Sequence, residues 1–89
     1  MAEEKKLLEF YGRECQPCVR LRPLIEKLER EEGVRVEKIE VWHNDDNAKL
    51  MEEYSQERCL GVPFLYNTKT GKYICGLTDY DTIKEWALE

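Results

Sequence analysis

The spacing of apolar side chains changes from strand-like to helix-like early in the chain. Residues 6–11 form a nearly continuous apolar run interrupted by Glu9, which is typical of a strand buried on both faces. Between Cys15 and Glu32 the apolar residues recur at the three- and four-residue intervals of an amphipathic helix, and Gly33 supplies a stop. Pro23 lies inside this pattern, where a proline removes a backbone hydrogen bond. The pattern alone predicts a strand and then a helix that is kinked or split at Pro23.

The rest of the chain predicts three more strands and two more helices. The expected segments are strands at 34–42, 62–66 and 72–75, a helix at 48–56, and a last helix capped by Thr78 or Asp79. A strand, a helix and a second strand in succession form a right-handed parallel unit. The predicted order is β-α-β-α-β-β-α, an α/β fold in a single domain over residues 1–89.

Composition and charge narrow the function classes. With 89 residues, 42% hydrophobic and 37% charged, the chain suits one soluble globular domain. A net charge of −5 argues against non-specific nucleic-acid binding. No apolar run approaches the length that spans a membrane, and Met1–Lys6 lacks the apolar core of a signal peptide. We therefore expect a cytoplasmic monomer with no nucleic-acid or membrane partner.

The candidate chemistry lies at Cys15-Gln16-Pro17-Cys18, between the first strand and the first helix. Two cysteines at this spacing in a short α/β chain predict a redox pair. The unpaired N–H groups and the positive end of the helix dipole stabilise a thiolate, the nucleophile of thiol–disulfide exchange. The alternatives are a structural disulfide and an unused pair.

The remaining candidate residues have plainer interpretations. Cys59 and Cys75 have apolar neighbours, so inert core thiols are the favoured interpretation. A disulfide between them, or a zinc site with all four cysteines, is the alternative, although their spacing of sixteen residues suits zinc poorly. His43 fits a solvated turn better than a metal ligand, and we expect Trp42 and Trp86 to be core or half-buried residues. No metal is expected.

Five features together resemble the thioredoxin and glutaredoxin families. These are the cysteine pair, Pro23 five residues after Cys18, Val62-Pro63 before the hairpin, Gly76 before the last helix, and the pair Glu9 and Lys38. The resemblance implies the thioredoxin fold, with a four-stranded mixed sheet flanked by helices and a cis-proline at Pro63. It also places Pro23 at the kink of one continuous helix.

The resemblance implies roles for these residues. Cys15 would attack a substrate disulfide, and the more buried Cys18 would resolve the mixed disulfide. Glu9 would accept the proton of Cys18, with Lys38 favouring the carboxylate; a half-exposed surface ion pair is the alternative. Substrates would bind at a further set of residues: Gln16, Pro17, Val62, Pro63 and Gly76.

Departures from the family pattern bear on the partner. Glu14 replaces the tryptophan usual before the first cysteine, and Phe64 replaces a small polar residue after the cis-proline. Gln16-Pro17 is nearer to thioredoxins, yet Val62-Pro63 and the segment 75–79 partly resemble the glutathione-holding segments of glutaredoxins.

The expected function is therefore that of a protein-disulfide reductase, an enzyme that exchanges electrons between a reductant and disulfide-containing proteins. It would need no cofactor, although glutathione is a candidate co-substrate. A glutaredoxin-like, glutathione-dependent oxidoreductase is one alternative. A non-catalytic binding module with the same fold is the other, and Glu14 favours it.

Overall fold

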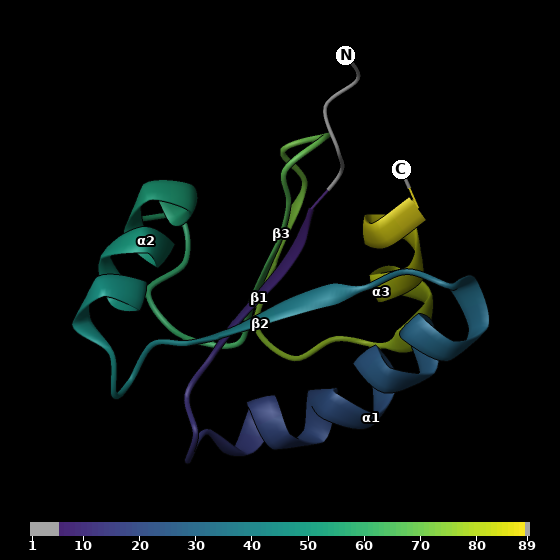
Figure 1. The fold of residues 1–89 in the computed structure, drawn as a ribbon, viewed down its shortest axis with the longest axis horizontal. Coiled ribbons are helices and arrows are strands. Elements are labelled where there is room, and N and C mark those ends of the chain that lie inside the picture. The colour runs from purple at the N-terminus through teal and green to yellow at the C-terminus, as the bar shows by residue number, and fades with distance from the viewer. Residues whose placement is uncertain (1–5, 89) are drawn as a thin grey trace.

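A computed structural model describes residues 6–88 of the chain (Figure 1). Met1–Lys5, on which most of the expected absence of a signal peptide rests, and Glu89 lie outside the described residues. The elements in chain order are β1 (Leu7–Tyr11), α1 (Gln16–Glu32), β2 (Val36–Glu40), α2 (Asp45–Ser55), β3 (Phe64–Asn67), β4 (Tyr73–Cys75) and α3 (Tyr80–Leu88). The predicted order of strands and helices is confirmed.

The strands form one mixed sheet in the order β2-β1-β3-β4. β1 pairs in parallel with β2 and antiparallel with β3, and β3 pairs antiparallel with β4. The helix that links β1 to β2 makes the parallel crossover that the sequence predicted. Because β1 is central, the loop that follows it emerges from the middle of one sheet edge, where segments after β2 and before β3 also converge.

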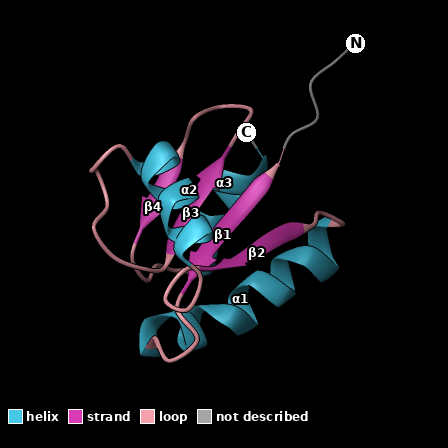
Figure 2. Cartoon of the chain, turned by 60° about the vertical axis from the view of Figure 1, so that its left-hand side comes forward, coloured by secondary structure: helices cyan, strands magenta, loops and turns pink. Residues whose placement is uncertain are grey.

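Helices cover both faces of the sheet (Figures 1 and 2). The face toward α1 and α3 buries Leu7, Leu65 and Ile83, while the face toward α2 buries Phe10, Phe64 and other apolar residues. Successive residues of β1 alternate between the two cores, as the strand pleat requires. This two-sided burial explains the nearly continuous apolar run in the sequence.

Helix α1 is continuous through Pro23. Cys15 is its N-cap, Pro17 lies in its first turn, and Gly33 ends it with a left-handed φ of 66°. The split at Pro23 that periodicity alone allowed does not occur. Packing explains this, because Leu21, Ile25 and other apolar residues of α1 are fully buried on either side of Pro23.

Several predicted boundaries shift by one to three residues. α2 begins at Asp45 instead of Ala48, because the side chain of Asn44 accepts the backbone N–H of Asn47 at 3.0 Å and caps the helix. Asp79 is the cap of α3, since its carboxylate accepts the N–H of Thr82 at 2.8 Å. Trp86 is buried, as expected, but the prediction for Trp42 is wrong: its side chain is 53% exposed.

Within residues 6–88, no helix has the length and apolar content needed to cross a membrane.

Candidate redox site

The cysteine pair forms a disulfide at the start of α1. Cys15 and Cys18 are bonded, with Cα atoms 5.2 Å apart. The backbone N–H of Cys18 points at the sulfur of Cys15 across 3.2 Å, so Cys15 caps the helix through its sulfur. No acidic residue lies in the first turn of α1, so the positive end of the helix dipole is not neutralised there. The geometry favours a thiolate at Cys15 once the bond is reduced.

Both cysteines are largely covered. Cys15 is 4% exposed and Cys18 is 2% exposed, so the expected difference in exposure is small. Gln16 and Pro17, which lie between them, are exposed. A partner that approaches the disulfide therefore contacts the exposed first turn of α1 before it contacts either sulfur.

The loop before β3 lies against the disulfide. The Val62–Pro63 peptide bond is cis, as the resemblance implied. The carbonyl oxygen of Val62 is 3.6 Å from the sulfur of Cys15. The N–H of Gly76 donates to the carbonyl of Pro63 at 2.8 Å, and Gly76 has a φ of 100° that favours glycine. Val62 thus lies against Cys15, while Pro63 beside it is fully buried and is bound by Gly76.

A buried carboxylate lies beneath the disulfide. Glu9 is 4% exposed, so the surface ion pair considered from the sequence is wrong. Glu9 and Cys18 line the same small hollow of about 200 Å³, together with Tyr11, Arg22 and Lys38. Burial raises the pKa of Glu9 to about 7, and the charges of Lys38 and Arg22 limit that rise. A carboxyl with this pKa exchanges its proton near neutral pH.

Lys38 acts on Glu9 from the neighbouring strand. The two residues are register partners in β1 and β2, which matches the predicted pair. However, the ammonium group of Lys38 binds Glu29, with Nζ 3.1 Å from a carboxylate oxygen, and it also donates to the carbonyl of Val36 at 3.2 Å. The Lys38 charge therefore lowers the pKa of Glu9 through space while its hydrogen bonds go elsewhere.

The residue before the first cysteine, Glu14, is held by a hydrogen bond with His43. Nε2 of His43 lies 2.7 Å from a carboxylate oxygen of Glu14, and this hydrogen bond lowers the pKa of Glu14. Beside them the indole of Trp42 lies directly over Gly12, where any Cβ would collide with the ring. An aromatic ring thus covers the loop before the cysteines, although it comes from the segment after β2.

Glu40 joins the two loops that carry these residues. Its carboxylate accepts the backbone N–H of Arg13 at 2.9 Å, of His43 at 2.8 Å and of Trp42 at 3.2 Å. Burial alone would raise the pKa of Glu40, but these N–H groups outweigh that effect and lower it. Glu40 is therefore the residue that fixes the segment before Cys15 to the segment after β2.

Replacing Glu40 with Ala should loosen both loops. We expect amide hydrogen exchange at Arg13 and His43 to accelerate by about tenfold or more, because each N–H loses its acceptor. Amides in the middle of β3 should keep their exchange rates. Unchanged exchange at Arg13 in Glu40→Ala would show that other contacts hold the loop.

The other two cysteines are also bonded. Cys59 and Cys75 form a disulfide with Cα atoms 5.6 Å apart, so the favoured interpretation of inert core thiols is wrong. The zinc site is wrong as well, since all four cysteines are paired with one another. Within residues 6–88, no cluster of three or more histidine, cysteine or carboxylate side chains is placed to hold a metal ion.

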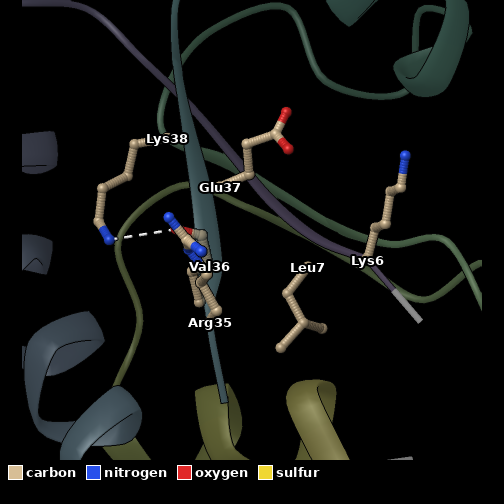
Figure 3. A pocket seen from close by; sticks show the side chains of 6 residues that line it. All are labelled: Lys6, Leu7, Arg35, Val36, Glu37 and Lys38. Carbon is tan, nitrogen blue, oxygen red and sulfur yellow. Dashed lines mark hydrogen bonds between the residues drawn. The ribbon is translucent and has the colours of Figure 1, made fainter. Parts of the chain in front are cut away.

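Another hollow lies away from the cysteines. It measures about 520 Å³ and lies along β2 and the start of β1, beside Lys6, Leu7 and Lys38 among others (Figure 3). Figure 3 shows the ammonium of Lys38 turned toward the carbonyl of Val36. Because the strand that forms this hollow is an edge strand, its charged side chains screen an open sheet edge.

The structure adds three residues to those expected from the sequence. Glu40, Trp42 and His43 hold or cover the segment before Cys15, yet no motif marks them. Their only signal in the sequence is a carboxylate at the end of the strand next to β1, followed closely by an aromatic ring and a histidine.

Solved thioredoxin structures match this chain. A mutant thioredoxin from Halobacterium salinarum NRC-1 shares 32% identity, with a TM-score of 0.74, over 93% of this chain and 71% of its own. Chloroplastic thioredoxin z shares 24% identity with a TM-score of 0.69, over 91% of this chain and 73% of its own. Thioredoxin O2 from Arabidopsis thaliana, in the oxidized state, shares 19% identity with a TM-score of 0.65, over 91% of this chain and 70% of its own.

The last two structures share less than 25% sequence identity with this chain, so their similarity shows the fold alone. No family model and no curated protein matches the chain. The identity and coverage shared with the halobacterial thioredoxin, together with the bonded pair at the start of α1, establish that this chain belongs to the thioredoxin family.

Proposed function

We propose that the protein is a protein-disulfide reductase that works through Cys15 and Cys18. The observation that carries this proposal is the position of the Cys15 sulfur at the N-cap of α1, 3.2 Å from the N–H of Cys18. Thiols at helix N-termini have pKa values lowered to roughly 3.5–7.5 from about 8.5, so a thiolate is present at neutral pH.

The reaction proceeds through a mixed disulfide. The thiolate of Cys15 attacks one sulfur of a substrate disulfide, which forms a Cys15–substrate bond and releases the other substrate sulfur as a thiolate. Cys18 then attacks Cys15, which restores the Cys15–Cys18 bond and releases the reduced substrate. A reductant regenerates the dithiol, and the protein itself needs no cofactor.

Cys18 must lose a proton before it attacks. Glu9 shares a hollow with Cys18 and has a pKa of about 7, so its carboxylate form accepts that proton near neutral pH. Lys38 moderates the pKa of Glu9 and keeps part of the population ionised. We assign Glu9 as the proton acceptor and Lys38 as the residue that tunes it.

The substrate binds beside the disulfide as an extended segment. The backbone of Val62, next to cis-Pro63, is within 3.6 Å of the Cys15 sulfur and offers main-chain hydrogen bonds to such a segment. Gln16 and Pro17 form the exposed opposite side, and Gly76 supports the Pro63 carbonyl. The partners are disulfide-bonded proteins, and the working unit is a monomer.

The reactivity of Cys15 tests the proposal. Alkylation of the reduced protein with iodoacetamide should show Cys15 reacting with an apparent pKa well below 8. With dithiothreitol as the electron source, the protein should also speed the reduction of a disulfide-bonded reporter. An ordinary thiol pKa together with no acceleration would reject the reductase and favour a non-catalytic binding module.

The electron donor separates two versions of this function. Reduced glutathione as the sole donor should support slow turnover, whereas a thioredoxin-reductase system should support fast turnover. This expectation rests on Gln16-Pro17 between the cysteines. Fast turnover with glutathione alone would instead favour the glutaredoxin-like alternative.

A further inference from the structure

The second disulfide ties a loop to the sheet. Cys59 lies in the segment 56–62 between α2 and β3, and Cys75 ends β4. Residues 56 and 57 have left-handed φ values of 49° and 66°, so the chain leaves α2 by a sharp turn. This segment, which we call the 56–62 loop, ends at Val62, whose carbonyl contacts the Cys15 sulfur.

The 56–62 loop meets the sheet through the packing of Cys59 and Val62 in the core on the α2 face and through two specific contacts with β4. The backbone N–H and Nε of Arg58 both donate to the carbonyl of Ser55, which belongs to the adjoining helix. The guanidinium of Arg58 lies over the ring of Tyr73, 4.6 Å from its centroid. The Cys59–Cys75 bond and this cation–π contact are thus the ties from the loop to β4 that the structure shows.

The loop forms one wall of a hollow next to the redox pair. The hollow measures about 260 Å³ and is lined mainly by apolar residues, including Trp42, Met51, Cys59, Leu60 and Val62. Leu60 is 91% exposed and Trp42 is 53% exposed, and they belong to the loops on its two sides. The position of the 56–62 loop therefore sets the width of this hollow.

The two residues of the second disulfide differ in exposure. Cys59 is 4% exposed and packs in the core beside Phe64, whereas Cys75 is an exposed residue on the edge strand β4. Of the two residues, Cys75 is therefore the one open to an incoming thiolate. A buried disulfide with one accessible end is open to thiol–disulfide exchange without unfolding of the core.

We propose that Cys59–Cys75 is a second redox site, reduced by low-molecular-weight thiols at Cys75, and that its state controls the 56–62 loop and the hollow beside the catalytic pair. The role in catalysis rests on the proposed reductase function, but the switch itself does not.

The chemistry balances with a monothiol as the reductant. A thiolate attacks the Cys75 sulfur, so a mixed disulfide forms and the Cys59–Cys75 bond breaks; Cys59 leaves as a thiolate and takes a proton from water. A second thiolate attacks the mixed disulfide and releases Cys75 as a thiolate. The protein gains two electrons, and two thiols become one small-molecule disulfide. Reduction removes the covalent tie to β4 and leaves the Arg58–Tyr73 contact and the packing of Cys59 and Val62, so the loop gains freedom.

The test uses a protein in which the catalytic pair is absent. In Cys15→Ser/Cys18→Ser, glutathione at increasing ratios of reduced to oxidised form should reduce Cys59–Cys75, seen as a mass increase after alkylation. Circular dichroism should show that the protein stays folded. Amide exchange of residues 59–62 should accelerate by about tenfold or more, while amides of β1 keep their rates.

A matched variant tests the same change in amide exchange without glutathione. Cys15→Ser/Cys18→Ser/Cys59→Ser/Cys75→Ser, without any thiol, should show the same fast exchange at residues 59–62. A disulfide that resists reduction until the protein unfolds, or reduction with unchanged exchange in the loop, would overturn the proposal. Because both proteins lack Cys15 and Cys18, this outcome is independent of whether the catalytic pair works as proposed.

Discussion

Cys15→Ser should abolish disulfide reduction, with a fall in turnover of at least about three orders of magnitude, the size typical of removing a catalytic nucleophile. Serine keeps the shape of the N-cap but offers a hydroxyl whose pKa is far above that of a thiol. The measurement is reduction of a disulfide-bonded reporter with dithiothreitol as donor. The helix should persist, because serine is itself a favourable N-cap residue.

Cys18→Ser separates the two halves of the same reaction. Cys15 can still attack, but nothing resolves the product, so a mixed disulfide between Cys15 and the reporter should accumulate. Mass spectrometry should detect one reporter per chain. Val19→Ser is the matched control, since Val19 is an exposed residue in the same turn of α1, and it should stay within about twofold of the parent activity. Full turnover in Cys18→Ser would refute the two-cysteine mechanism.

Glu9→Gln should stabilise the protein at alkaline pH by about 3 kcal/mol. The folded state raises the pKa of Glu9 from 4.5 to about 7, and each unit corresponds to about 1.4 kcal/mol. In the parent, the folded state favours the protonated acid. The stability that protonated Glu9 contributes is therefore fully present below pH 4.5 and is lost as the pH rises through about 7. Glutamine keeps the neutral form at every pH.

Urea denaturation at a series of pH values measures this difference. The free energy of unfolding of Glu9→Gln should exceed that of the parent at pH 8.5 and approach it at pH 4.5. Glu37→Gln, which removes an exposed carboxylate of β2, should leave the pH dependence of the parent in place. Equal stability of Glu9→Gln and the parent at pH 8.5 would show that Glu9 ionises without cost.

The sequence predicted the order of the elements because its apolar residues follow either a strand-like or a helix-like spacing. Burial of Leu7, Phe10 and Leu65 on two sides of one sheet produced the nearly continuous apolar strands. Pro23 was the exception: periodicity alone allowed a split, and tertiary packing keeps the helix intact. The cis peptide at Pro63 came from the family resemblance, since no local pattern specifies it.

The missed parts of the site depend on contacts between segments that are distant in sequence. Glu40 holds Arg13 across 27 positions, and His43 meets Glu14 across 29. Cys59 and Cys75 have apolar neighbours whether bonded or free, so their pairing appears only when β4 is laid beside β3. Trp42 packs its ring over Gly12, a contact across thirty positions, and remains 53% exposed.

The turn between β3 and β4 is a suitable point for attaching the protein to a surface. Thr68 and Lys6 exchange hydrogen bonds at 3.0 Å, which fixes this turn beside the start of β1. The cysteine pair follows the other end of β1, so the strand separates the two by its full length. Protein anchored to a sensor chip or an electrode through the turn would present its sulfur chemistry to the solution, with every molecule facing the same way.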